Sequence, residues 1–244
     1  MRLDRFALIV VLMLLAPAAW GATIPVIWDS NFGPVLFSGD DSVAVSQPIG
    51  VTFPFLGTNY TDVTISTNGF IQLGGTDGPG CCSGNVTGFL NGFARISPAW
   101  LDWTDRVYLN TFADHATITW DGAETLTGAI GQFQLQLYTD GLIIFGYNAL
   151  GFSAHVGLVG VTPGGGAADP GGTNFVPGQN LIAGPTVYQT AGGLSYLEGY
   201  NIVFTPDSTT GGWVVDTTPE PSTFGLLAIG AGAFVMLRRR KCKA

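Results

Sequence analysis

Short runs of alternating or continuous apolar residues, broken by Gly, Asn, Asp or Pro, fill the sequence from residue 23 to residue 206. The clearest is residues 132–138, QFQLQLY, in which polar and apolar side chains alternate. A strand places successive side chains on opposite faces, so this pattern predicts a β-strand. Thr139-Asp140-Gly141 follows it and favours a hairpin turn into residues 142–145. No segment here keeps a helical period, and the whole pattern predicts an all-β fold.

We predict that residues 22–207 form one domain, an antiparallel β-sandwich. In residues 132–138, one face would carry Phe133, Leu135 and Leu137 toward the core. The opposite face would carry Gln132, Gln134, Gln136 and Tyr138. The expected strands are residues 43–45, 49–53, 62–66, 70–73, 106–112, 116–121, 130–138, 143–147, 155–161 and 199–204.

Three other stretches lack strand character. Residues 74–92 and 163–193 are long and rich in Gly, which predicts either functional or poorly ordered loops. Residues 208–218, which contain Thr-Thr-Gly-Gly, are typical of a linker. Asp40-Asp41 and Asp77-Gly78 are typical of turns.

The N-terminal 21 residues have the features of a signal peptide. Arg2 and Arg5 precede an apolar run, residues 6–16, and small residues follow it. We expect export by the Sec machinery, with cleavage after Gly21 or after Ala18. A first transmembrane helix is the alternative, and the run is too short to favour it.

The C-terminal segment, residues 219–244, has three parts in order. Pro219, Glu220 and Pro221 open it, and the uncharged residues 222–237 follow. As a helix these 16 residues would span about 24 Å, which is short for a bilayer core of about 30 Å. A basic cluster then comes, Arg238, Arg239, Arg240 and Lys241. Basic residues stay cytoplasmic, so we expect a single hydrophobic helix with everything before Pro219 outside.

This order resembles the PEP-CTERM sorting signal of Gram-negative bacteria. The resemblance implies an inner-membrane precursor that exosortase, a membrane protease, cuts near the Pro-Glu-Pro motif. The protein would then reach the cell surface or the extracellular space, after transient membrane insertion through its tail. An ordinary C-terminal membrane anchor is the alternative, although a plain anchor needs neither the Pro-Glu-Pro motif nor so short a span.

The charge of the exported chain restricts its partners. Residues 22–218 keep two basic residues, Arg95 and Arg106, and 15 acidic residues, for a net charge of −13. Such a surface repels nucleic acid and anionic lipid. It favours solubility and attracts divalent cations.

The core also resembles a known extracellular family. Residues 53–60 (FPFLGTNY) and 63–71 (VTISTNGFI) are similar to the opening of nidogen-like (NIDO) domains, and residues 96–102 (ISPAWLD) to a later element of them. Phe133-Gln134, Asp140-Gly141, Phe145 and Tyr147 match the family's strand-turn-strand pattern. Ser97, Ala99 and the insertion at 74–92 depart from the family's pattern. The resemblance, over residues 29–161, implies an extracellular β domain of matrix and adhesion proteins without a known catalytic centre.

Few residues suggest chemistry. Asp102 and Asp105 flank Trp103-Thr104 and could form a turn, bind Ca²⁺ or act as an acid/base pair, but no dense Asp-rich loop supplies the six to eight oxygens that calcium takes. His115 and His155 stand in no metal or nucleophile motif, and we expect them to be exposed.

The aromatic and sulfur side chains offer two further candidates. We assign Trp100 to the core. Core packing is the favoured role of Trp103 as well, but of the tryptophans it is the better candidate for stacking on a sugar at the surface. Cys81 and Cys82 are adjacent and would meet an oxidising compartment. They could form a strained vicinal disulfide, bond another chain or stay free.

These observations favour a noncatalytic secreted or cell-surface protein in adhesion or biofilm-matrix assembly, in contact with extracellular polysaccharide or surface proteins. A carbohydrate-binding module is the alternative, and a secreted hydrolase using Asp102 and Asp105 is a third hypothesis. We expect no cofactor, with calcium as the one candidate ion.

Overall fold

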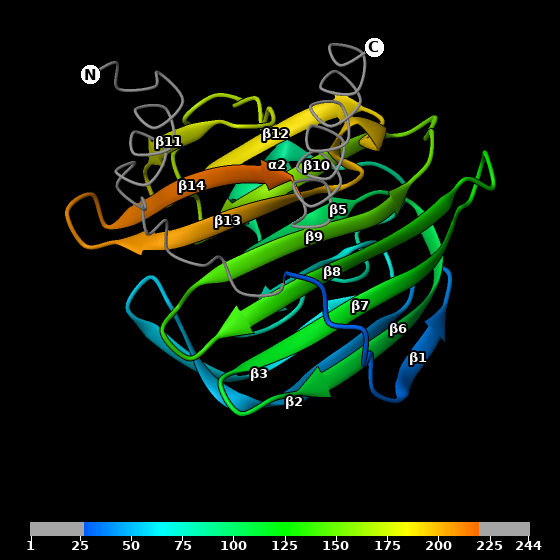
Figure 1. The fold of residues 1–244 in the computed structure, drawn as a ribbon, viewed down its shortest axis with the longest axis horizontal. Helices are drawn as coiled ribbons and strands as arrows, with labels where there is room; N and C mark the ends of the chain where they lie inside the picture. The colour runs from blue at the N-terminus through cyan, green and yellow to red at the C-terminus, as the bar shows by residue number, and fades with distance from the viewer. Residues whose placement is uncertain (1–26, 220–244) are drawn as a thin grey trace, which may run out of the picture.

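Two antiparallel sheets pack face to face in the computed structural model, which describes residues 27–219 (Figure 1). This confirms the predicted all-β fold with two antiparallel sheets. The predicted signal peptide and C-terminal helix lie outside the described residues. Sheet A has the order β1 (Val35–Gly39), β6 (Trp103–Thr111), β7 (His115–Glu124), β8 (Ile130–Tyr138), β9 (Ile143–Leu150), β13 (Tyr200–Asp207), β14 (Gly212–Pro219) and β11 (Asn180–Ala183). Sheet B has the order β12 (Val187–Gly192), β10 (Val156–Thr162), β5 (Ala94–Trp100), β4 (Phe70–Leu73), β3 (Thr58–Ser66) and β2 (Val43–Phe55).

The core lies between the two sheets because their inner faces carry apolar side chains at every second position. These side chains have no exposed surface, and they include Ile65, Ile71 and Ile96 of sheet B and Val107, Ile118, Leu135 and Phe145 of sheet A. Burial of this apolar area is the main force that holds the sheets together.

The outer face of sheet A is covered by the start of the described chain. Gln134 Nε2 donates a hydrogen bond to the Asp29 carbonyl (2.8 Å), and its Oε1 accepts one from the Asp29 amide (3.0 Å). Gln136 Nε2 donates to the Ile27 carbonyl (3.0 Å). Both glutamines are fully buried, so the alternation predicted for β8 is present while its polar face is not exposed to water.

Two predicted strands, β4 and β8, have the predicted bounds, and others are longer than expected. The predicted strands 43–45 and 49–53 form one strand, β2, whose register against β3 shifts twice. Strands β1, β5, β11, β12 and β14 were not among the predicted strands.

The segment 74–92, predicted as a functional or poorly ordered loop, packs on the outer face of sheet B. Its short helix α2 (Val86–Asn91) begins at Asn85, whose side-chain oxygen accepts a hydrogen bond from the Gly88 amide. Phe89 and Leu90 of this helix join a small apolar cluster on sheet B, with Phe70, Trp100, Leu158 and Tyr188.

The two other segments without predicted strands also contribute to the sheets. Strands β11 and β12 lie within residues 163–193. The linker predicted at 208–218 is wrong, because its Thr-Thr-Gly-Gly makes the turn of a hairpin into β14. In β14 the buried Trp213, Val215 and Thr217 alternate with less buried residues, and the strand pairs with β13 and β11.

The two ends of the described chain lie close together on sheet A. The Ile27 carbonyl lies against Gly146 of β9. Gly146 pairs with Asn201 of β13, and Asn201 pairs with Thr218 of β14. At about 4.8 Å per strand, Ile27 and Thr218 lie on the order of 10 Å apart along the sheet.

Candidate functional site

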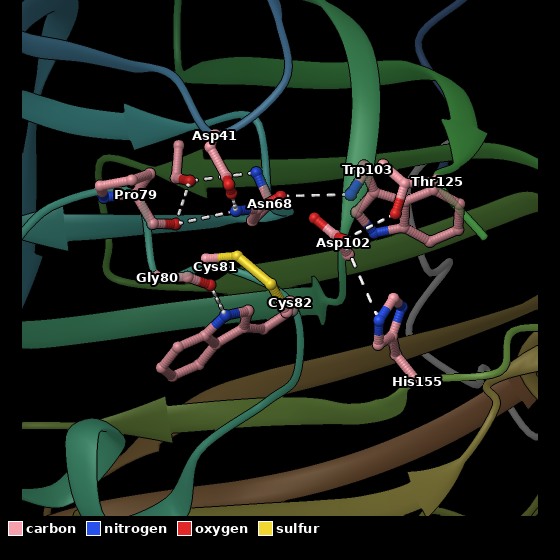
Figure 2. The surroundings of a disulfide bond; sticks show 12 residues. Asp41, Asn68, Pro79, Gly80, Cys81, Cys82, Asp102, Trp103, Thr125 and His155 are labelled. Atoms are coloured by element: carbon pink, nitrogen blue, oxygen red, sulfur yellow. Dashed lines mark hydrogen bonds and ion pairs between the residues drawn. A yellow bond between two sulfur atoms is a disulfide. The ribbon is translucent and has the colours of Figure 1, made fainter.

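Asn68 joins three loops at one end of the sandwich (Figure 2). Its Nδ2 donates hydrogen bonds to Asp41 Oδ1 (2.8 Å), in the turn between β1 and β2, and to the Pro79 carbonyl (3.2 Å). Its Oδ1 accepts from the Trp103 amide (3.1 Å) at the start of β6. Asn68 is fully buried, and the next residue, Gly69, has φ +76° and packs so closely on Ala99 that a Cβ would collide with its carbonyl oxygen.

Cys81 and Cys82 form a disulfide beside this junction (Figure 2). Of the three predicted alternatives, the structure therefore contains the vicinal disulfide, and not free thiols or a bond to another chain. The preceding loop is fixed to sheet B, since Trp100 Nε1 donates to the Gly80 carbonyl (2.6 Å) and Ser66 Oγ donates to the Pro79 carbonyl (2.7 Å).

Asp102 faces both the disulfide and the turn between β1 and β2. One carboxylate oxygen from each of Asp40, Asp41 and Asp102 lies within 4.8 Å of the others, and the sulfur atoms of Cys81 and Cys82 approach Asp102 as closely. Asp102 Oδ2 accepts a hydrogen bond from Thr125 Oγ1 (2.6 Å). Asp102 Oδ1 is buried and has no hydrogen-bond partner.

His155 links Asp102 to the buried Glu124. Its Nε2 lies 4.0 Å from Asp102 Oδ2, and its Nδ1 lies 2.5 Å from Glu124 Oε1. Burial raises the pKa of Glu124, but hydrogen bonds from Thr127 and His155 outweigh burial and hold this pKa below its usual value. Ser153 Oγ contacts the backbone of His155 and Glu124 Oε1 rather than the imidazole ring, so these side chains do not form a serine–histidine nucleophile pair.

Asp105, predicted to act with Asp102, lies in a different environment. It points inward from β6 and is 3 % exposed, over Gly122 of β7, where a Cβ would collide with its carboxylate. Neither of its oxygens has a hydrogen-bond partner. Burial first, and the charge of Asp121 second, raise the pKa of Asp105 well above its usual value. Asp102 instead groups with Asp40 and Asp41, so the predicted pair of Asp102 and Asp105 is not a site.

Trp103, the candidate for sugar stacking at the surface, lies in the core instead. It has no exposed surface, its Nε1 donates to the Ala99 carbonyl (2.9 Å), and it packs against Phe133 with ring centroids 5.5 Å apart. Trp103 begins β6, and the inward face of that strand takes its indole into the core. Trp100, expected in the core, is buried under helix α2 and its neighbours.

Both histidines, expected to be exposed, are largely buried. His115 stacks between Phe112 and Tyr138, with both centroid distances 4.5 Å. Its Nε2 lies 3.0 Å from Asp29, in the segment that covers sheet A. This histidine therefore holds the N-terminal segment in place.

Arg95 and Asp77 form an ion pair that the sequence did not reveal. Arg95 is 2 % exposed, lies over the rings of Phe70 and Trp100, and has its Nη2 2.5 Å from Asp77 Oδ1. Burial lowers the pKa of Arg95, and the adjacent Asp77 opposes this. The pair fixes the loop 74–92 to sheet B, and the signal that could have identified it is an arginine placed within an otherwise apolar strand.

Comparison with protein families accounts for most of the chain. A model described as NIDO related matches residues 28–204. The chain belongs to the NIDO-related family. The Asn68 junction and the buried Tyr147, whose hydroxyl donates to the Pro98 carbonyl (2.8 Å), come from segments that resemble this family. No curated protein and no solved structure matches the chain.

A second model, the PEP-CTERM protein-sorting motif, matches residues 217–241. The match begins within β14, the last described strand, which follows the end of the NIDO-related match and ends at Pro219. Glu220, Pro221 and the basic cluster of Arg238, Arg239, Arg240 and Lys241 lie outside the described residues. Within residues 27–219 no helix is long and apolar enough to cross a membrane. The sorting motif supports an exported protein whose membrane-bound precursor is processed by exosortase.

Proposed function

We propose that this chain is a noncatalytic component of the cell surface or extracellular matrix and acts by adhesive contact. The observation that carries the proposal is that a sorting motif closely follows the NIDO-related domain and begins within β14, a strand paired with that domain's β13. That domain has 15 acidic and two basic residues over residues 22–218, so its contacts with other surfaces depend on charge.

The arrangement of polar side chains supports contact rather than turnover. The acid/base pair required by the hydrolase hypothesis does not form, since Asp105 is buried over Gly122 while Asp102 lies with Asp40 and Asp41. Trp103 cannot stack on a sugar, as the carbohydrate-binding hypothesis requires, because its side chain is buried in the core.

A binding experiment tests the proposal. Purified protein should be retained on envelope or matrix material from the producing cells, and its retention should fall with salt, which screens charge over about 10 Å at 0.1 M. An acidic protein of similar size and charge is the matched control. The same preparation should not hydrolyse polysaccharides, esters or peptides.

Three results would change the conclusion. Retention equal to that of the control protein would contradict adhesion. Turnover that is lost in Asp102→Asn would favour the hydrolase. Tight, salt-independent binding to one glycan would favour a carbohydrate-binding module with residues other than Trp103.

A further inference from the structure

The turn between β1 and β2 and the connection between β5 and β6 bring three carboxylates together. One oxygen from each of Asp40, Asp41 and Asp102 lies within 4.8 Å of the others. The three belong to segments about 60 residues apart in the chain, so their approach is a product of the fold. Asn68 sets this approach by bonding both Asp41 and the Trp103 amide, next to Asp102.

Asp102 contributes an oxygen that nothing in the described chain satisfies. The residue is 9 % exposed, and its Oδ2 is held by Thr125 while its Oδ1 is buried without a partner. Figure 2 shows the oxygen that is not bonded to Thr125 directed toward the side of Asn68 and Asp41. A buried carboxylate oxygen without a donor costs free energy unless a donor or cation meets it.

No arginine or lysine of the described chain can neutralise this cluster. Between residues 27 and 219 the only such side chains are Arg95, paired with Asp77, and Arg106, paired with Asp121. His155 approaches Asp102 on the Oδ2 side, 4.0 Å away.

We propose that Asp40, Asp41 and Asp102 bind a calcium ion that joins the loop between β1 and β2 to the start of β6. The ligand atoms are carboxylate oxygens, which suit a hard divalent cation, and the Cys81–Cys82 disulfide removes the thiolates that a softer metal would take. Calcium takes six to eight oxygens in flexible geometry, so backbone carbonyls and water can complete a set that starts from three carboxylates on loops. Magnesium needs a nearly ideal octahedron and fits such a site less well.

Calcium titration of the purified full chain in mild detergent tests the site. Isothermal calorimetry should show one saturable site, with a Kd on the order of 10⁻⁴ to 10⁻³ M, the range of extracellular modules. The melting temperature should rise with calcium over the same concentrations and return after EGTA is added. Magnesium should bind at least about tenfold more weakly.

Substitutions identify the ligands. Asp102→Asn and the double variant Asp40→Asn with Asp41→Asn should each weaken calcium binding at least about tenfold, because each removes charged ligands. The double variant changes two exposed residues, so it covers the case in which Asp102→Asn perturbs folding. Asp62→Asn is the matched control, since Asp62 is exposed on β3 and outside the cluster.

Absence of saturable binding up to about 10 mM calcium would overturn the proposal, as would equal shifts in all variants including Asp62→Asn, which indicate screening. Binding of zinc in place of calcium would also overturn it. The proposal does not rest on the adhesive function, and its test reads binding and melting rather than retention on cells.

Discussion

Replacement of Asp105 should stabilise the protein. Asp105 is 3 % exposed on the inner face of β6, and both its oxygens lack hydrogen-bond partners. A buried polar group without a partner costs about 1–3 kcal/mol. Asp105→Val removes both oxygens, and its shorter reach leaves the space over Gly122 free. We therefore expect a gain of about 1–3 kcal/mol, which is a rise in Tm of roughly 2–12 °C for a domain of this size.

The pH dependence separates ionisation from packing. Because the pKa of Asp105 is raised in the folded state, the unfolded chain loses this proton first as pH rises above the ordinary value of 3.8. Stability therefore falls with rising pH between that value and the raised pKa, and is retained at lower pH. Asp105→Asn removes this titration while keeping a polar side chain, so its stability relative to the wild type should increase as pH rises from about 4 to 7.

Urea unfolding at a series of pH values, with Asp62→Asn as an exposed control, measures both effects. A loss of stability in Asp105→Val, or a difference between Asp105→Asn and the wild type that does not change with pH, would refute the reasoning. Either result would mean that the ionised carboxylate of Asp105 is stabilised by a partner in the folded protein.

Four further predictions follow from the structure. Trp103→Ala should destabilise the fold by about 3–5 kcal/mol, as large truncations in cores do, whereas Phe152→Ala, at a residue 67 % exposed, should change stability by less than about 0.5 kcal/mol; equal effects would place Trp103 outside the core. Replacement of Cys81 and Cys82 by Ser should leave Tm nearly unchanged, because a bond between adjacent residues closes almost no loop, and a large drop would contradict this. Glu124→Gln should lower stability at pH 7 and have less effect in acid, since the lowered pKa of Glu124 contributes stability above its ordinary value of 4.5 that is lost as pH falls through the folded pKa; urea unfolding checks the sign. In a host with exosortase, intact mass should show a chain that ends near residues 219–221 without the basic end, and Glu220→Ala should leave precursor in the inner membrane; surface protein that keeps Arg238 would contradict cleavage.

The sequence predicted what depends on local periodicity. The alternation at 132–138 identified β8, and the Asp-Gly turn after it identified the hairpin into β9, because both signals lie within a few residues. The sequence did not predict strands β11 and β14, because their assignment depends on pairing with distant strands and their flanks are rich in Gly.

The candidate site could not be predicted from local sequence, because its residues come from distant segments. The spacing of Asp102 and Asp105 suggested a pair, but one lies in a connection and the other points inward from β6. The partners of Asp102 come from the turn at residues 40–41, which local sequence indicates only as a turn. The burial of Gln134 and Gln136 depends on residues 27–29, more than 100 positions earlier.

The closeness of Ile27 and Thr218 on sheet A determines how a tethered precursor would be presented. The start of the described chain and the strand that leads into the sorting motif leave from the same patch of sheet A, so a precursor held through the sorting motif would have this patch toward its point of attachment. The hairpin tips where Gly141 lies against Pro54 and Pro206 are toward the other end of β13, roughly 17 Å from the Thr218 partner Asn201 at about 3.4 Å per residue. A tether at that patch therefore leaves these tips at the end of β13 that is away from the point of attachment.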